Sequence, residues 1–234
     1  MGIYQKNNFI NFLFPIPKNE FGTQCLHHLR GEFAFAIWDE PNQLLFAARD
    51  RFGIKPLYYT FYDDTLYLAS EVKALFAAGV PLRWDYESFL QADSGVLTGN
   101  RTLFANVSQV PPGYFLLASR YGTQLHRYWD FYYPRLTELP SKKSENKKSE
   151  DYIEKLRYTL DEAIRLRLRA DVPVGCYLSG GVDSSTILGI AATHQSEAIH
   201  TFTVAFDDEA YNEESIDREM AAHVGAHLHS HSIA

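Results

Sequence analysis

The stretch "GCYLSGGVDSSTILGI", residues 175–190, decides how the second half of the chain folds. An apolar run leads into two glycines, and hydroxyl residues with one carboxylate then open an apolar helix. A loop between a strand and a helix directs unpaired backbone N–H groups and the positive helix end toward one place. Gly180 and Gly181 have no Cβ, so the backbone can approach an anion closely. The stretch therefore predicts a phosphate-binding turn.

The side chains of this loop favour a phosphate that is held together with a metal ion. Ser179, Ser184 and Ser185 add hydroxyl donors, whereas Asp183 would repel a bare phosphate. Since a carboxylate and phosphate oxygens are a usual ligand set for Mg²⁺, we expect Asp183 to bind Mg²⁺. The alternative is a strand-to-helix turn with an aspartate N-cap and no ligand.

Two commoner loop motifs do not fit these residues. The Walker A loop needs a lysine before its hydroxyl residue, and here Val182 and Asp183 precede Ser184. The nucleophile elbow needs the pattern G-x-S-x-G, and neither Ser179 nor Ser184 lies in one. Glycines, an aspartate and serines concentrated at a strand–helix junction favour the phosphate site over the unliganded turn.

Around this loop the hydrophobic pattern alternates between strand and helix. We expect a strand at 172–178, a helix at 183–194, a strand at 198–206, a helix at 212–225 and a strand at 226–234. Asn212 can cap the last helix and Gly225 can end it. This order is typical of an α/β fold with a parallel sheet and right-handed crossovers. Because three parallel strands are few for a complete domain, we expect the sheet to continue beyond residue 234.

The first half of the chain predicts antiparallel sheet instead. The expected strands are 32–40, 43–50, a hairpin at 56–70 that turns at Asp63 and Asp64, 111–119 and 124–133. Residues 70–79 change to helical spacing and stop at Gly79. Lysine, serine and glutamate, with no apolar residue for ten positions, mark 139–151 as a solvated linker, and 151–171 follows as an amphipathic helix.

Composition limits the class of protein. The chain has 234 residues, 46% of them hydrophobic, and a net charge of −7, with no basic stripe for nucleic acid. No apolar run approaches the roughly 18 residues of a membrane span. Cys25 and Cys176 are far apart and have no metal or redox spacing. We therefore expect a cytoplasmic protein with reduced, packed thiols and with neither nucleic acid nor membrane as a partner.

Several motifs in order resemble one enzyme family. "SGGVDSS" is similar to the pyrophosphate loop of the ATP-pyrophosphatase ligases. More narrowly, it resembles glutamine-hydrolysing asparagine synthetase, together with "RGEFAFAIWDE", "ARDRFGIKPLYY", "LYLASEVKAL", "VPPGYFLL" and "RYWD" upstream. The resemblance implies a partial α+β glutaminase-type antiparallel domain at 1–130 and a linker at 131–150. It also implies a partial α/β ATP-pyrophosphatase domain at 151–234.

The resemblance also implies substrates and site residues. Such enzymes use ATP and Mg²⁺ to convert aspartate, through aspartyl-AMP, to asparagine with nitrogen from glutamine or ammonia, and related enzymes often form homodimers. Carried onto this chain, the pyrophosphate would lie against Ser179, Gly180, Gly181, Ser184 and Ser185, Mg²⁺ against Asp183, and the nucleoside against Leu178 and Val204. For Val204, a plain core valine is an equal alternative.

The chain departs from the family pattern in its first half. The family's nucleophile is a cysteine at the mature N-terminus, but Met1 is followed by Gly2, and the glutamine-holding residues precede the segment that matches. Cys25 cannot offer an N-terminal amine, so we interpret it as a packed thiol. Two alternatives to asparagine synthesis follow: a catalytically incompetent fragment with at most weak ATP or pyrophosphate binding, and a related ligase with another acceptor.

Two further groups of residues are weaker candidates. His227, His229 and His231 alternate, so in a strand they share one face that could bind zinc, although the family needs no such metal. The charged residues around Asp50 predict support of the sheet or a contact between domains rather than catalysis; they are Arg49, Asp50, Arg51 and Lys55.

Overall fold

A computed structural model describes residues 22–138, 149–208 and 212–233 of the chain. The chain divides into two compact units, Met1–Tyr133 (unit 1) and Pro134–Ala234 (unit 2). Residues 1–21 and residues 139–148 of the expected linker lie outside the described residues.

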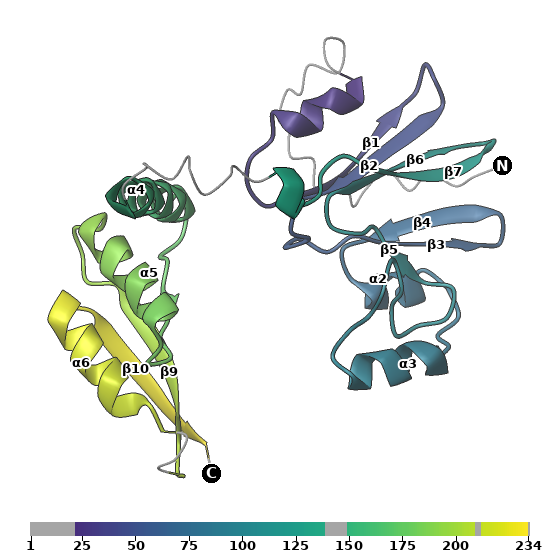
Figure 1. Ribbon diagram of the computed structural model, residues 1–234. Coiled ribbons are helices and arrows are strands. Elements are labelled where there is room, and N and C mark those ends of the chain that lie inside the picture. The colour runs from purple at the N-terminus through teal and green to yellow at the C-terminus, as the bar shows by residue number, and fades with distance from the viewer. Residues whose placement is uncertain (1–21, 139–148, 209–211, 234) are drawn as a thin grey trace. The chain divides into compact units, whose positions relative to one another are not determined.

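Unit 1 contains two antiparallel sheets, drawn in Figure 1 with β1, β2, β6 and β7 in one and β3, β4 and β5 in the other. The first sheet has the order β1 (Ala34–Asp39), β2 (Leu44–Arg49), β6 (Tyr114–Ser119), β7 (Gly122–Arg127). The second has the order β4 (Thr65–Ala69), β3 (Tyr58–Tyr62), β5 (Ser108–Gln109). The predicted antiparallel character of this half is confirmed.

Buried side chains form three hydrophobic clusters in unit 1. One cluster joins the two sheets face to face and includes Ala47, Leu57, Val110, Leu116 and Ala118. A second covers the other face of the first sheet beneath the 3₁₀ helix η1 (Gly22–His27), and a third joins the second sheet to α2 (Val72–Ala77). The inner strands β2 and β6 of the first sheet therefore bury side chains on both of their faces.

Turn chemistry at two predicted positions is confirmed. Asp63 and Asp64 adopt φ values of 48° and 53°, as the tight hairpin between β3 and β4 requires. Gly79 follows α2 at φ 100°. The strand predicted at 124–133 is shorter, because the N–H groups of Tyr128 and Trp129 both donate to the carbonyl of Gly113 instead of continuing the ladder. The sequence reading also missed α3 (Tyr86–Asp93), whose N-cap is Asp85.

Unit 2 is a three-stranded parallel sheet with helices, as predicted. Its sheet order is β10-β9-β8, and the core includes Leu178, Leu188, Ile199 and Ala221. The described elements are η2 (Leu136–Glu138), α4 (Ser149–Arg167), β8 (Cys176–Tyr177), α5 (Val182–Thr193), β9 (His200–Phe206), α6 (Glu214–Val224) and β10 (His227–Ile233). The strand expected at 172–178 pairs with β9 only at its last residues.

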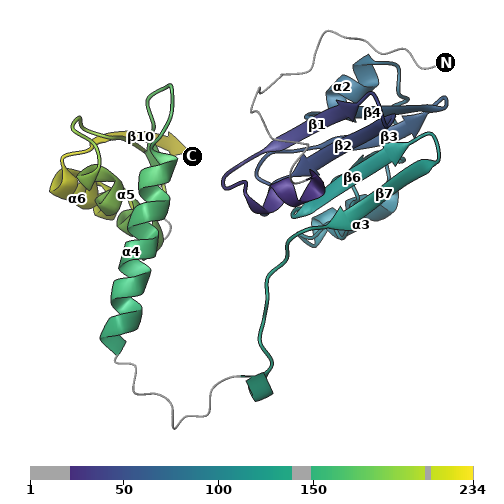
Figure 2. The same cartoon turned by 90° about the horizontal axis from the view of Figure 1, so that it is seen from above.

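The amphipathic helix α4 packs through its C-terminal half. Ile164 is buried, whereas Ile153 and Leu156 are 56% and 60% exposed. Figure 2 shows the N-terminal part of α4 extending beyond α5. A 2.8 Å contact between His194 Nε2 and Asp161 Oδ1 joins α5 to the packed half. The periodicity thus predicted the helix, but only half of its apolar stripe meets a core.

Candidate functional site

The glycine loop lies at the carboxyl end of β8 and the N-terminus of α5. Leu178 is 3% exposed, and its N–H donates to the Phe202 carbonyl at 3.0 Å, so the strand is anchored to β9 until the loop begins. Gly181 is the N-cap of α5, with φ −79° and ψ 158°. The loop therefore occupies the junction at which a helix presents its unpaired N–H groups.

Two serine hydroxyls meet across the loop. The Oγ atoms of Ser179 and Ser184 are 3.1 Å apart, and Ser184 Oγ also accepts the Ser179 N–H at 3.2 Å. The same hydroxyl lies 3.2 Å from the Gly181 carbonyl. Ser185 follows within α5 and is half-buried, with its N–H donating to Gly181 O. The structure thus brings the predicted serines together around the two glycines.

Four backbone donors remain at the start of α5. The N–H groups of Gly181, Val182, Asp183 and Ser184 have no hydrogen-bond acceptor among the described residues. The side chain of Asp183 is exposed in the same first turn. Orphan N–H groups, the helix dipole and neighbouring hydroxyls together form an arrangement that can hold an anion.

Gly180 bends the loop and faces a residue that the sequence reading missed. It adopts φ 63°, and its N–H donates to Asp217 Oδ1 at 2.6 Å. Asp217, on α6, is 1% exposed, and its other oxygen accepts the hydroxyl of Thr203. A Cβ at Gly180 would lie 2.9 Å from the Cβ of Glu213. The sequence contained one signal for this contact. Asp217 is a carboxylate on the buried face of the helix expected at 212–225, and a buried carboxylate needs hydrogen-bond donors nearby.

Val204 lies on the neighbouring strand β9, directly after Thr203. It is 46% exposed and pairs with His231 across the β9–β10 ladder. Its neighbours Thr203 and Ala205 are buried on the opposite face. Within the described residues Val204 is therefore not a core valine. Its predicted contact with a nucleoside stays a prediction.

The histidines of β10 lie on the same face as His200 of β9. His200 Nδ1 and His229 Nε2 are 2.8 Å apart, and the His227 ring centroid is 5.3 Å from that of His200. His229 also stacks on Phe202, with centroids 5.0 Å apart. Across the described part of the chain, no group of three or more His, Cys, Asp or Glu residues is arranged to hold a metal ion.

The charged patch after β2 fixes its own loop. The buried carboxylate of Asp50 accepts the backbone N–H groups of Phe33, Phe52, Ile54 and Lys55 at 2.9–3.3 Å. Arg49, also buried, donates to the carbonyls of residues 53, 55 and 110 and to the Gln109 side chain. These bonds stabilise the connection between the two sheets, in agreement with the structural reading of the patch.

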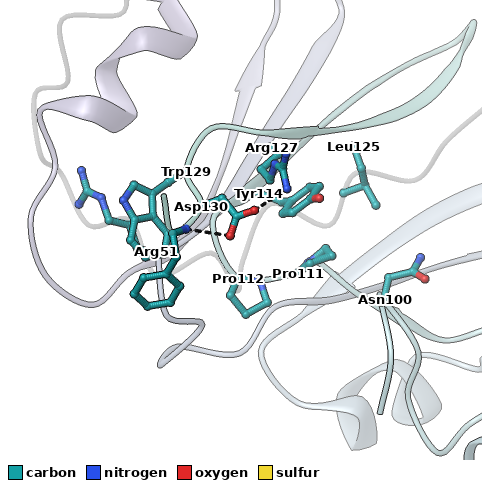
Figure 3. A pocket seen from close by; sticks show the side chains of 11 residues that line it. Arg51, Asn100, Pro111, Pro112, Tyr114, Leu125, Arg127, Trp129 and Asp130 are labelled. Carbon is teal, nitrogen blue, oxygen red and sulfur yellow. Dashed lines mark hydrogen bonds and ion pairs between the residues drawn. The ribbon is translucent and has the colours of Figure 1, made fainter. Parts of the chain in front are cut away.

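A cavity of about 570 Å³ in unit 1 lies beside this connection, as Figure 3 shows. Arg51, Arg127, Trp129 and Asp130 are among its lining residues. Arg51 donates to the Leu29 carbonyl at 2.7 Å, and Arg127 pairs with Asp130 at 2.5 Å. Each guanidinium thus has one acceptor on the protein itself.

Cys25 is a packed thiol. It lies in η1, is 4% exposed and contacts the core that includes Phe46 and Phe115. Burial raises the pKa of its thiol, which disfavours the nucleophilic thiolate. The geometry agrees with the interpretation of Cys25 as structural.

Comparison with known proteins relates both units to enzymes. Residues 17–129 match the glutamine amidotransferase domain family and residues 155–234 match the asparagine synthase family. Amidase chry2 of Gibberella zeae and amidase chyE of Penicillium rubens are each 38% identical over 89% of this chain and 32% of the relative. Asparagine synthetase [glutamine-hydrolyzing] 1 of Bacillus subtilis is 35% identical over 88% of this chain and 31% of its own length.

The chain thus spans about a third of the length of the curated relatives it matches. The solved structure of a glutamine PRPP amidotransferase from B. subtilis aligns with 89% of this chain and with 49% of its own chain. Its TM-score of 0.32 and its sequence identity of 14% are too low to support an inference about this chain. In the described parts of the chain, none of the helices combines the length with the hydrophobicity that a membrane span requires. The order of the two matched domains and the identities to the synthetases place this chain in the family of glutamine-hydrolysing asparagine synthetase-like proteins.

Proposed function

We propose that unit 2 carries the nucleotide site of an ATP-dependent ligase of the asparagine synthetase type. The supporting observation is the loop from Ser179 to Ser185, in which four N–H groups without acceptors among the described residues lie next to paired hydroxyls. Together with the match of residues 155–234 to the asparagine synthase family, this favours a pyrophosphate site over an unliganded turn. We also propose the domain limits 1–130 and 151–234, with a linker at 131–150.

The residues present suit Mg·ATP. Backbone donors and the Ser179 and Ser184 hydroxyls would hold the β and γ phosphates, and Ser185 would add a donor in the first turn. Asp183, exposed in the same turn, would hold Mg²⁺, which usually takes one or two carboxylates together with phosphate oxygens. When bound, the ion would reduce the negative charge on the departing pyrophosphate. Leu178 and Val204 would contact the nucleoside.

This unit's own groups would act by alignment rather than by covalent chemistry. Fixed N–H donors at a helix N-terminus lose little entropy on meeting the charge of the leaving phosphates. Holding ATP in one orientation lets an acceptor carboxylate approach the α phosphorus in line with the leaving oxygen. The loop therefore supplies orientation and charge stabilisation.

The identity of the acceptor substrate is the more specific part of the proposal. Relatives named asparagine synthetase favour aspartate as acceptor, with glutamine or ammonia as the nitrogen source. Relatives named amidase share a higher identity with this chain and favour a ligase with another acceptor as the second candidate. An assay for the formation of asparagine, AMP and pyrophosphate from aspartate, ATP and a nitrogen source distinguishes the two candidate acceptors. Pairing into a homodimer is part of the first proposal.

Titration calorimetry of the 234-residue chain with Mg·ATP tests the nucleotide site. Asp183→Ala should weaken binding by about 1–3 kcal/mol, because a metal ligand is lost. Glu197→Ala, an exposed carboxylate after the other end of α5, is the matched control and should leave the isotherm unchanged. Equal affinity of the wild type and Asp183→Ala would refute the assignment of Asp183. Absence of any wild-type binding would refute the site.

A further inference from the structure

A buried carboxylate lies directly against the loop. Asp217 Oδ1 accepts the Gly180 N–H at 2.6 Å, and Oδ2 accepts the Thr203 hydroxyl at 2.5 Å. Asp217 is 1% exposed, and burial of a carboxylate is costly unless both oxygens have donors. The two donors come from the loop and from β9, while the acceptor belongs to α6. One side chain therefore connects three separate elements.

The direction of the Gly180 N–H divides the loop into two parts. Because this N–H donates to a buried atom, it is committed to the protein rather than to a ligand. The next four N–H groups, Gly181 to Ser184, have no acceptor among the described residues. The left-handed φ of Gly180 provides the bend between the anchored amide and the start of α5.

We propose that Asp217 is a positioning residue for the phosphate loop. It fixes the bend at Gly180 and so aligns the N–H groups of residues 181–184 with the pyrophosphate part of ATP. This role rests on the proposed nucleotide site. Asp217 acts through the Gly180 backbone without touching the nucleotide, and Thr203 keeps its carboxylate oriented.

The role depends on an acceptor oxygen and not on negative charge. A charge beneath the loop opposes a phosphate above it, so an uncharged acceptor of the same shape can do the same work. Asp217→Asn keeps an oxygen for Gly180, and its amide can donate to the Thr203 hydroxyl. Asp217→Ala removes the acceptor and leaves the Gly180 N–H unpaired. The asparagine variant is therefore the matched control.

The test measures binding of Mg·pyrophosphate to the full chain by calorimetry, together with hydrogen exchange at the Gly180 amide. Asp217→Ala should weaken binding at least about tenfold and accelerate exchange, because the Gly180 N–H loses its only acceptor among the described residues. Asp217→Asn should bind as the wild type does, or more tightly, and keep the amide protected. His194→Ala removes the contact with Asp161 elsewhere in unit 2 and should change neither readout.

The outcomes separate this inference from the function on which it rests. The positioning role is overturned if Asp217→Ala binds Mg·pyrophosphate as tightly as the wild type does. It is also overturned if the alanine and asparagine variants bind equally weakly. Either result leaves the nucleotide site standing. A wild-type chain that binds neither Mg·ATP nor Mg·pyrophosphate would overturn both. If the alanine variant does not fold, Thr203→Val should weaken pyrophosphate binding and Thr203→Ser should restore it, and equal affinities would count against the role.

Discussion

Replacing Gly180 by alanine should destabilise unit 2 through two separable effects. The residue adopts φ 63°, where an L side chain costs about 1–2 kcal/mol. The new Cβ would also lie 2.9 Å from Glu213 Cβ and 3.1 Å from its Cδ, so the loop or α6 must shift. Such overpacking costs about 1–3 kcal/mol, which gives a total of about 2–5 kcal/mol. Loss of the loop shape should also weaken Mg·ATP binding.

Two further variants isolate the effects. Gly225 has φ 70° and no atom within 4 Å of an added Cβ, so Gly225→Ala should show only the conformational cost of about 1–2 kcal/mol. Glu213→Gly removes the colliding Cβ, and glycine is accepted at this N-cap position. Combining it with Gly180→Ala should recover the overpacking part, which appears as non-additivity in a double-mutant cycle.

The measurement is urea unfolding of the full chain with two signals. All three tryptophans lie in unit 1, so their fluorescence reports that unit, whereas circular dichroism at 222 nm includes the helices of unit 2. Gly180→Ala should shift the dichroism transition and leave the fluorescence transition in place. Equal destabilisation by Gly180→Ala and Gly225→Ala, or additivity with Glu213→Gly, would refute the steric argument.

Other perturbations address unit 1. Asp50→Ala should lower the free energy of unfolding by about 3 kcal/mol or more in fluorescence-detected melts, because four N–H donors lose their acceptor; a change below 1 kcal/mol would contradict this. Gly113→Ala should destabilise far more than Gly122→Ala, since only the first places a Cβ 2.5 Å from the Trp129 carbonyl. Burial raises the pKa of Tyr128 to about 12. The folded state therefore favours the neutral phenol, and this contribution to stability is present below pH 10 and lost between 10 and 12. A Tyr128→Phe variant should lack the late step in an ultraviolet absorbance titration, and an identical titration would count against it.

Sequence reasoning succeeded where local chemistry decides the structure. The hairpin at Asp63 and Asp64, the helix end at Gly225 and the strand–helix order around the glycine loop each depend on a few adjacent residues. The positions of Ser179 and Ser184 followed from the same junction. In these cases turn propensity and hydrophobic period carry the information.

Sequence reasoning failed where contacts between distant segments decide the structure. Asp217 is 37 residues from Gly180, and only the crossing of α6 over the loop brings the two together. The end of β7 depends on the Gly113 carbonyl, which captures two N–H groups from the following residues. The exposed start of α4 has an apolar stripe that met no described partner, although its periodicity equals that of the buried half. Periodicity shows which face is apolar and not what covers it.

Side-chain alternation along β9 makes the pairing of this strand part of the loop's construction. Thr201, Thr203 and Ala205 point to the helix side, while Phe202, Val204 and Phe206 point to the other side. Slippage by a single residue would exchange the two sets and present Val204 or Phe202 to Asp217 in place of a hydroxyl. The carboxylate would then lose a donor, and with it the support for Gly180. A misregistered strand would therefore disable the loop without any change in the loop's own residues.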